Sequence, residues 1–378
     1  MLHAGEPDAE GKAKIEPFLN SLIKRFNECY TPTEFLSLDE MVIGFKGRFM
    51  FLQFNMTKPA KHHIKAFGLT DSSSGYVLNL LVYFGANTSY DPRSANLDGN
   101  AVKIFDSLLP VLGPDASGFT VFCDRWYTTK VLIDYSLKQR FYLTATVQAN
   151  RKGFPPALKG LKLKHMEQRY WLTEDQTTMV CAFQDKKAKK HVIMASTDAS
   201  NDSVTVKAGL GTREKPSMVT TYNNYMNGCD RADQAIGYYG IHNRKSRKWW
   251  KKVFFWALEI TQNNAYILFK MTRDRPLTKR DEANLSLKNF KKALVNQLEA
   301  KAAGLEDTFE TPRKPVGRPP TLSPIQRAVP GMHLIEHAGL GNDRMCKVCK
   351  RRSSYVCGSC PHKPHLHPKE CFRKFHKP

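Results

Sequence analysis

The sequence is poor in acidic residues for its size: 35 Asp and Glu stand against 58 Lys and Arg in 378 residues, a formal net charge of +23. Such an excess is typical of a chain with a polyanionic partner, and nucleic acid is the first candidate. The sequence also lacks a long apolar run, because the longest, Val253–Ile260, is short and contains Glu259. The N-terminus has neither the basic start nor the apolar core of a secretory signal. We therefore expect no membrane span.

Cysteine is sparse over most of the chain. The first four cysteines are scattered singly, at Cys29, Cys123, Cys181 and Cys229. The other five lie between Cys346 and Cys371, mixed with histidines. This usage is typical of a reducing compartment with one local metal site, and it excludes a disulfide scaffold.

The C-terminal segment has the spacing of a zinc module. Its pattern is Cys346-x2-Cys349-x7-Cys357-x2-Cys360-x10-Cys371-x4-His376, with His333, His337, His362, His365 and His367 nearby. Two Cys-x2-Cys pairs suit tetrahedral Zn²⁺, and five Cys with at least two His nearly complete two sites. A segment this short and polar would not fold on apolar burial alone. Its basic character favours nucleic-acid binding, and a RING- or PHD-like protein-binding module, as in a ubiquitin ligase, is the alternative.

A second stretch with chemical interest runs from Ser37 to Arg48. It sets Asp39 and Glu40 in an apolar, strand-like run and follows them with Lys46 and Arg48. Carboxylates hold hard cations such as Mg²⁺, whereas Lys and Arg hold phosphates. Strand alternation turns Glu40 to the face opposite Asp39. An exposed acidic pair at a strand edge is the plain alternative, and Lys46 and Arg48 fit phosphate contacts or a packing role equally well.

The order of predicted elements indicates an α/β fold with a ribonuclease-H-like sheet. A helix over Lys14–Tyr30 leads into the Ser37–Arg48 strand, and two further β-like runs form an antiparallel meander with it. A continuous apolar run then ends at Asp124, which predicts a central strand covered on both faces. The further runs are strands at Ile64–Leu69, Tyr76–Phe84, Phe119–Asp124 and Phe141–Val147, and helices at Ala101–Leu112 and Trp126–Arg140. In this layout the first and fourth strands are neighbours, so Asp39 and Asp124 should meet.

The rest of the first 240 residues predicts an insertion and a third source of carboxylates. Residues 148–190 read as a β-rich insertion, His191–Ser196 as a short strand and Asp198–Pro216 as a polar loop. A helix around Asp230 and Asp233 would place these carboxylates on one face. Phosphoryl transfer on DNA uses two divalent ions about 4 Å apart, and carboxylates from distant parts of a chain can hold them.

Basic residues then dominate the sequence. From Ile241 to Arg280 there are eleven Lys or Arg against two acids, so we expect DNA contacts from Arg247 and Lys248. A solvated basic face on a core helix is the alternative. After a polar helix at Asp281–Ala303, the linker Gly304–Pro330 contains Arg313-Lys-Pro-Val-Gly-Arg-Pro-Pro320, an AT-hook-like core in which Arg318 would enter the minor groove. An ordinary basic linker or a nuclear-import signal fits this segment as well, and we expect a nuclear protein.

Several long motifs occur together and in order, and with them the chain resembles the piggyBac transposases and their domesticated derivatives. These motifs are Ser37-Leu-Asp-Glu-Met-Val-Ile-Gly-Phe-Lys-Gly-Arg48, Cys123-Asp-Arg-Trp-Tyr-Thr-Thr129, Met226-Asn-Gly-Cys-Asp-Arg-Ala-Asp-Gln234, Arg247-Lys-Trp-Trp250 and Cys371-Phe-Arg-Lys-Phe-His376. The resemblance runs from about residue 14 to the end.

The resemblance implies a DDE-type DNA transposase: a ribonuclease-H-like catalytic domain with a β-rich insertion, and a small cross-brace zinc domain. It implies that Asp39, Asp124 and Asp230 hold two Mg²⁺ or Mn²⁺ ions, with Asp233 as an auxiliary carboxylate. Relatives cut double-stranded DNA at transposon ends through a hairpin, join the ends to TTAA targets and act as homodimers. The implied ligands of two Zn²⁺ ions are Cys346, Cys349, Cys357, Cys360, His367, Cys371 and His376, with His365 or His333 as the eighth.

Two departures qualify this expectation. Only 38 residues precede Asp39, fewer than in relatives, which indicates a truncated copy, a fragment or a domesticated gene. His367 stands where relatives often have Cys, a change that zinc tolerates. We therefore keep a catalytically silent DNA- or chromatin-binding protein as the alternative function.

The predicted organisation is a helical remnant at 1–30, the transposase domain at 31–280 with its insertion at 148–190, a helix and basic Pro-rich linker at 281–330, and the zinc domain at 331–378.

Overall fold

The computed structural model describes residues 11–113, 116–186, 188–198, 202–208, 211–238, 240–272, 286–304, 335–338, 344–358, 360, 363–368 and 370–376. The chain divides into two compact units, Met1–Thr261 and Gln262–Pro378. Among the helices within these ranges, none is long and apolar enough to cross a membrane. The boundaries of the four predicted domains stay predictions.

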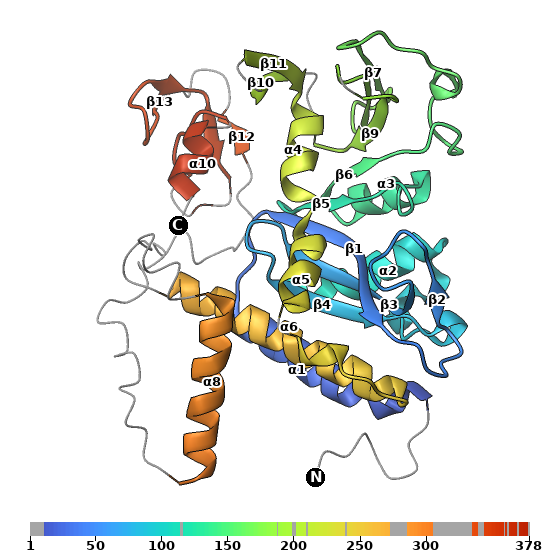
Figure 1. Ribbon diagram of the computed structural model, residues 1–378. Helices are drawn as coiled ribbons and strands as arrows, with labels where there is room; N and C mark the ends of the chain where they lie inside the picture. The colour runs from blue at the N-terminus through green and yellow to red at the C-terminus, as the bar shows by residue number, and fades with distance from the viewer. Residues whose placement is uncertain are drawn as a thin grey trace. The chain divides into compact units, whose positions relative to one another are not determined.

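A single large sheet forms the centre of the first unit (Figure 1). Its strands are β1 (Phe35–Gly44), β2 (Gln53–Phe54), β3 (His62–Asp71), β4 (Val77–Val82), β5 (Thr120–Cys123), β6 (Tyr142–Thr146), β7 (Gln168–Leu172), β8 (Met179–Phe183) and β9 (Val192–Ser196). Their order is β2-β3-β1-β5-β6-β9-β8-β7, with β4 paired to β3. The antiparallel β1-β3-β4 meander is confirmed, and so is the predicted neighbourhood of the first and fourth strands, because β1 pairs with β5 in parallel.

Helices cover both faces of this sheet. They are α1 (Glu16–Cys29), α2 (Asn100–Leu108), α3 (Lys130–Lys138), α4 (Ser217–Tyr225), α5 (Gly228–Gly237) and the first half of α6 (Trp249–Met271). Helix α5 packs against β1 and β3, α2 against β3 and β4, and α3 against β6 (Figure 1). Strands β4 and β5 are buried along their whole length. For β5, the continuous apolar run ending at Asp124 predicts this burial.

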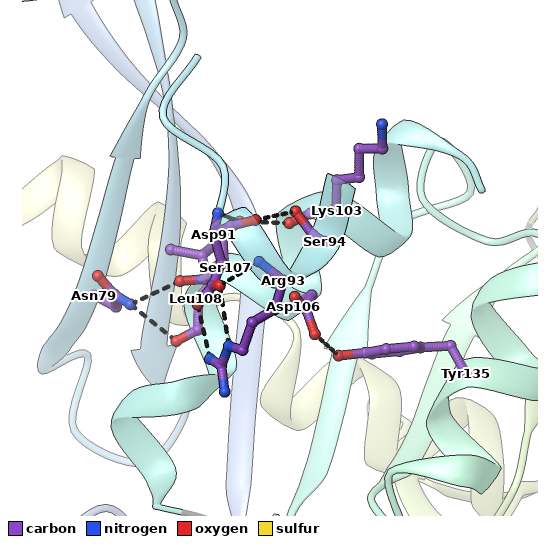
Figure 2. Close-up of polar contacts among 9 residues, drawn as sticks. All are labelled: Asn79, Asp91, Arg93, Ser94, Lys103, Asp106, Ser107, Leu108 and Tyr135. Carbon is purple, nitrogen blue, oxygen red and sulfur yellow. Dashed lines mark hydrogen bonds and ion pairs between the residues drawn. The ribbon is translucent and has the colours of Figure 1, made fainter. Parts of the chain in front are cut away.

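Polar contacts fix α2 to the sheet and to α3, as Figure 2 shows. The Asn79 side chain on β4 donates to a last-turn carbonyl of α2 at 2.9 Å, and the backbone N–H of Asp91 donates to Oγ of Ser107 at 2.9 Å. On the other side of α2, the Tyr135 hydroxyl donates to Oδ1 of Asp106 at 2.6 Å. Each buried hydrogen bond of this kind contributes about 1 kcal/mol net and sets the helix in one register.

Three details differ from the expectations or go beyond them. Residues Asp198–Pro216 do not form a loop throughout, because β10 (Ser203–Ala208) and β11 (Gly211–Pro216) form an antiparallel hairpin there. The period-two alternation around Val204 and Val206 is the sequence pattern that indicates this strand. The β-rich insertion contributes β7 and β8, and these extend the main sheet through β9, a placement that the sequence analysis did not specify. Helix α3 begins at Lys130 rather than near Trp126, because the Thr129 side chain caps it by accepting from the Leu132 N–H.

The second unit contains the C-terminal half of α6, helix α8 (Leu287–Ala302) and a small module around the cysteines. Tyr266 and Phe269 of α6 pack on Phe290 of α8, with ring centroids 5.5 and 5.3 Å apart. The module has two short antiparallel pairs, β12 (Ile335–His337) with β15 (Tyr355–Cys357) and β13 (Arg344–Met345) with β14 (Arg352–Ser353), followed by α10 (Glu370–His376). The AT-hook-like segment with Arg318 lies outside the described residues.

Candidate functional site

Asp39 and Asp124 come from neighbouring parallel strands. Strand β1 pairs with β5 over Phe35–Ser37, with Ser37 opposite Phe122. The same register, extended by two residues, sets Asp39, midway along β1, opposite Asp124, which directly follows β5. The β1–β5 ladder ends before this point, so the two carboxyl groups stand at an opening in the sheet, where α/β proteins commonly bind ligands.

Helix α5 brings two further carboxylates to this opening. Where β1 no longer has β5 as a partner, the Val42 N–H donates to Oδ2 of Asp233 at 3.2 Å. Asp230 lies in the first turn of α5 and is exposed to solvent. The structure therefore brings Asp39, Asp124, Asp230 and Asp233 to one place from two strands and one helix.

A glycine allows this close approach of α5. A Cβ at Gly228, the first residue of α5, would lie only 2.4 Å from Oγ of Ser37 and 2.4 Å from Oγ1 of Thr70. These two hydroxyls bond each other at 2.8 Å in the buried space below the helix. The next residue, Cys229, is buried against the Gly68 carbonyl of β3 at 3.4 Å. The first turn of α5 thus rests directly on β1 and β3.

Two of the carboxyl groups, those of Asp39 and Asp233, have a raised pKa. Burial raises the pKa of Asp39 to about 7; the Glu40 N–H opposes this shift, and the negative charges of Asp124 and Asp230 add to it. Burial also raises the pKa of Asp233 to about 7, against the opposing Val42 N–H. Like charges this close disfavour full ionisation.

The donor set at this opening fits a hard divalent cation. All donors are carboxylate oxygens, which Mg²⁺ and Mn²⁺ prefer. In the described part of the chain, Oδ1 of Asp233 is buried and has no hydrogen-bond partner. A cation would supply that partner and relieve the repulsion that raises the Asp39 pKa. Asp39, Asp124 and Asp230 are the residues placed to hold such an ion, with Asp233 beside them.

Sequence reasoning missed one cation near these acids. The positive charge of Lys58, in the connection between β2 and β3, lowers the pKa of both Asp39 and Asp233. The residues around Lys58 in the sequence give no sign of this role, because its position depends on how the β2–β3 hairpin folds. The hairpin folds back beside Gly44, where a Cβ added to the glycine would lie 3.3 Å from the Cβ of Ala60. The proximity of Lys58 to these acids could therefore be recognised only from the tertiary structure.

The expected phosphate contacts lie on exposed segments. Lys46 and Arg48 follow β1 and are exposed, and Arg247 and Lys248 are exposed just before α6. A cavity of about 840 Å³ begins next to Asp124, at Arg125. Its other basic lining residues are Lys162, Lys189, Lys190 and His191. A cavity so rich in cations favours an anionic ligand.

One compact cluster at the C-terminus combines three cysteines and a histidine. The ligand atoms of Cys346, Cys349, His367 and Cys371 all lie within 4.8 Å of one another. Nδ1 of His367 lies 3.3 Å from Sγ of Cys349, while its Nε2 bonds the Arg352 carbonyl at 2.9 Å. A histidine whose second nitrogen bonds a carbonyl is oriented as metal-binding histidines are. The donor set suits tetrahedral zinc.

A second cluster contains Cys357, Cys360 and His376, again within 4.8 Å. Nε2 of His376 lies 3.3 Å from Sγ of Cys360, and its Nδ1 bonds the Phe372 carbonyl at 2.8 Å. His365 belongs to neither cluster in the described residues, and its Nδ1 bonds the Ser353 carbonyl at 2.8 Å. His333 lies outside the described residues, so the eighth ligand stays a prediction.

Comparison with known proteins agrees with this geometry. The family described as Transposase IS4 matches residues 3–266. PiggyBac transposable element-derived protein 3 from Homo sapiens is 23% identical over 375 residues, covering 96% of this chain and 59% of the relative. PiggyBac transposable element-derived protein 5 from Homo sapiens is 24% identical over 318 residues, covering 80% of this chain and 56% of the relative.

A solved structure shares the fold. The chain matches a cryo-EM structure of the piggyBac transposase synaptic complex with hairpin DNA at a TM-score of 0.58 and 21% identity, covering 93% of this chain and 77% of that one. The chain spans less than two thirds of the length of the two human relatives. From the family match over residues 3–266, the chain belongs to the Transposase IS4 family, and over most of its length it is similar to piggyBac transposable element-derived proteins.

Proposed function

We propose that this chain is the core of a DDE-type DNA transposase that cuts and joins DNA strands at TTAA targets. The observation that carries the proposal is the gathering of Asp39, Asp124 and Asp230 at the opening between β1 and β5, with a pKa near 7 for Asp39. Carboxylates held close together in mutual repulsion suit a divalent cation. The family membership supports the same reaction class.

In this proposal Asp39, Asp124 and Asp230 hold two Mg²⁺ or Mn²⁺ ions. When bound, such ions activate the attacking oxygen and stabilise the leaving oxygen of a phosphodiester. Asp233 accepts the Val42 N–H and so holds α5 in the register that presents Asp230. Lys58 adds a positive charge beside the acids, where the phosphate of a bound strand would otherwise meet only negative charge.

The DNA partner is double-stranded and includes the transposon ends. Lys46, Arg48, Arg247 and Lys248 are exposed and would contact backbone phosphates, and Arg318 would enter a minor groove. The two Cys/His clusters would each hold one Zn²⁺, which stabilises a module too small to fold on its apolar core. A homodimer and a nuclear location complete the proposal; both follow from the family resemblance and the basic linker.

A nicking assay tests the catalytic assignment. The full chain is incubated with a supercoiled plasmid carrying a TTAA-flanked transposon end, with and without Mg²⁺. We expect nicking that requires Mg²⁺ and falls by at least a hundredfold in Asp124→Asn, because one ligand of the metal pair is lost. The matched control is Asp134→Asn, an exposed carboxylate on α3. If Asp124→Asn nicks as fast as the unchanged chain, the assignment is wrong.

One observation favours a second function. The human relatives that match most of this chain are named as transposable element-derived proteins, so a descendant that binds DNA without cutting it is the alternative. Such a protein would retain salt-dependent binding through its basic segments. Binding of a transposon-end duplex together with a complete lack of Mg²⁺-dependent nicking would select this second function.

A further inference from the structure

An exposed tryptophan lies beside the acidic cluster. Trp126 comes two residues after Asp124, and its side chain remains 44% exposed. Its backbone N–H donates to Oδ1 of Asp124 at 2.7 Å, so the loop that carries the indole is tied to the carboxylate.

The indole is held from one side by a built arrangement of neighbours. The Phe67 ring lies nearly parallel to it, at 22° and 6.3 Å between centroids. The Lys65 ammonium lies 4.8 Å from the Trp126 centroid and 4.7 Å from that of Phe67, and it also forms an ion pair with Glu40. Glu40 adjoins Asp39 on β1 but faces the opposite side of the sheet, as its β3 partner Phe67 does. The same network therefore connects the indole to both strands that supply the carboxylates.

The loop itself is fixed by hydrogen bonds. The Arg151 guanidinium donates to the carbonyls of Arg125 and Trp126, at 2.5 and 3.3 Å. The Thr128 hydroxyl donates to the Asp124 carbonyl at 2.9 Å, and Tyr127 is fully buried beneath the loop. A binding surface that is already ordered loses little entropy when a ligand arrives.

The chemistry of this surface points to one ligand. A flat aromatic face attracts another π-face, and nucleic-acid proteins use such faces to stack bases. Paired bases inside a duplex cover their own faces, so only an unpaired or extruded base fits. Arg125, exposed beside the indole, suits a phosphate next to such a base. A related transposase has been solved with hairpin DNA, and the turn of a DNA hairpin leaves bases unpaired.

We propose that Trp126 is a stacking platform that binds an unpaired nucleobase beside Asp124. The proposal rests on the proposed transposase function and adds a base-binding site to it. It assigns Glu40 and Lys65 as positioning residues, because they reach the base only through the indole. They hold the ring in place beside Asp124.

A binding measurement without cleavage tests the proposal. The full, zinc-loaded chain is titrated in Ca²⁺ with three fluorescent DNAs: a duplex closed by a hairpin with 2-aminopurine at its tip, the same hairpin with an abasic tip, and a blunt duplex. We expect the base-bearing hairpin to bind about tenfold more tightly than the abasic one, the effect of one base–aromatic stack. The 2-aminopurine emission should fall on binding, because stacking quenches it.

Substitutions then assign the effect to the indole. In Trp126→Ala the tenfold preference for a base should disappear and the quenching should be lost, whereas Trp126→Phe should keep most of both. Phe54→Ala, which removes another exposed aromatic ring of the same sheet, should change neither. Lys65→Met should weaken the preference and Lys65→Arg should restore it, because Arg also offers a cation to the rings.

The outcomes distinguish failure of the stacking site from failure of DNA binding. If the chain binds all three DNAs but does not distinguish base from abasic tip, or if Trp126→Ala keeps the distinction, the stacking site is wrong and DNA binding stands. If the unchanged chain binds none of the three DNAs, the proposed function fails and the stacking site fails with it.

Discussion

The sharpest consequence of the acidic cluster is that the chain should lose stability as the pH rises. Burial raises the pKa of Asp39 and of Asp233 from 3.8 to about 7. Between roughly pH 4 and pH 7 the native state therefore keeps protons that the unfolded chain has released. The free energy of unfolding then decreases with pH across this window and levels off above pH 7.

The size of the effect follows from the shifts. One pKa unit corresponds to about 1.4 kcal/mol, so a shift of about three units sets a ceiling of roughly 4 kcal/mol for one carboxyl group. The two groups interact and share the charge of Lys58, so their contributions do not add fully. We expect a total loss of about 2–4 kcal/mol between pH 5 and pH 8 without Mg²⁺. Mg²⁺ at about 100 times its dissociation constant should return roughly 2.7 kcal/mol at pH 8.

Urea unfolding at pH 5, 6, 7 and 8 measures this slope, with zinc bound and Mg²⁺ absent. Asp39→Asn and Asp233→Asn each keep an oxygen that accepts the Glu40 or Val42 N–H but cannot ionise, so each should flatten the slope. Asp134→Asn, on the exposed face of α3, should leave it unchanged. A stability that rises from pH 5 to pH 8, or a slope that both cluster variants leave intact, would refute the account of the cluster.

Three other consequences are open to direct measurement. Gly228→Ala should destabilise the first unit by about 1–3 kcal/mol in urea unfolding, because its Cβ meets two hydroxyls at 2.4 Å, whereas Gly237→Ala, with nothing within 4 Å, should be neutral. Colorimetric titration of released metal should find two Zn²⁺ per chain and one fewer in His376→Ala, and chelation should unfold the C-terminal module as seen by circular dichroism. Lys65→Met should cost about 1–3 kcal/mol in urea unfolding, since the partly buried Glu40 loses its partner; equal stability would remove this ion pair from the account.

Much of the fold was accessible from the sequence because the informative runs were long and periodic. The apolar run ending at Asp124 predicted a strand covered on both faces, and β5 is buried throughout. The predicted order of elements placed this strand beside the first one, which the parallel β1–β5 pairing confirms. A helix was expected around Asp230 and Asp233, with both carboxylates on one face, and α5 spans both.

Other features depend on contacts that no local pattern records. The loop containing Trp126 has a helical composition, yet Asp124 accepts its N–H and Thr129 caps α3, so the helix starts four residues later. Lys58 influences Asp39 only because a distant hairpin folds back toward it. The partners of Lys65, a glutamate and three aromatic rings, come from β1, β3 and the segments after β4 and β5.

The roles of individual residues do not follow from the fold alone. Seven predicted zinc ligands gather in two clusters, but the identity of the ion stays a prediction. The four basic residues expected to contact DNA are exposed: Lys46, Arg48, Arg247 and Lys248. Exposure alone does not distinguish a DNA contact from a solvated charge, because both are exposed in the free protein. Substitution by Ala, followed by the salt dependence of DNA affinity, would separate them, since each lost phosphate contact lowers the slope by about one.

The central claim is that Asp39, Asp124 and Asp230 hold metal ions against the phosphate that is cut. Its most direct test is cleavage of a transposon-end duplex with a single phosphorothioate in which sulfur replaces a non-bridging oxygen of the scissile phosphate. Mg²⁺ binds sulfur poorly and Mn²⁺ binds it better. We predict that the sulfur duplex is cut slowly in Mg²⁺ and is rescued by Mn²⁺, and that Asp39→Asn abolishes cleavage of both duplexes. Equal cleavage of the oxygen and sulfur duplexes in Mg²⁺, or cleavage that survives Asp39→Asn, would contradict the account.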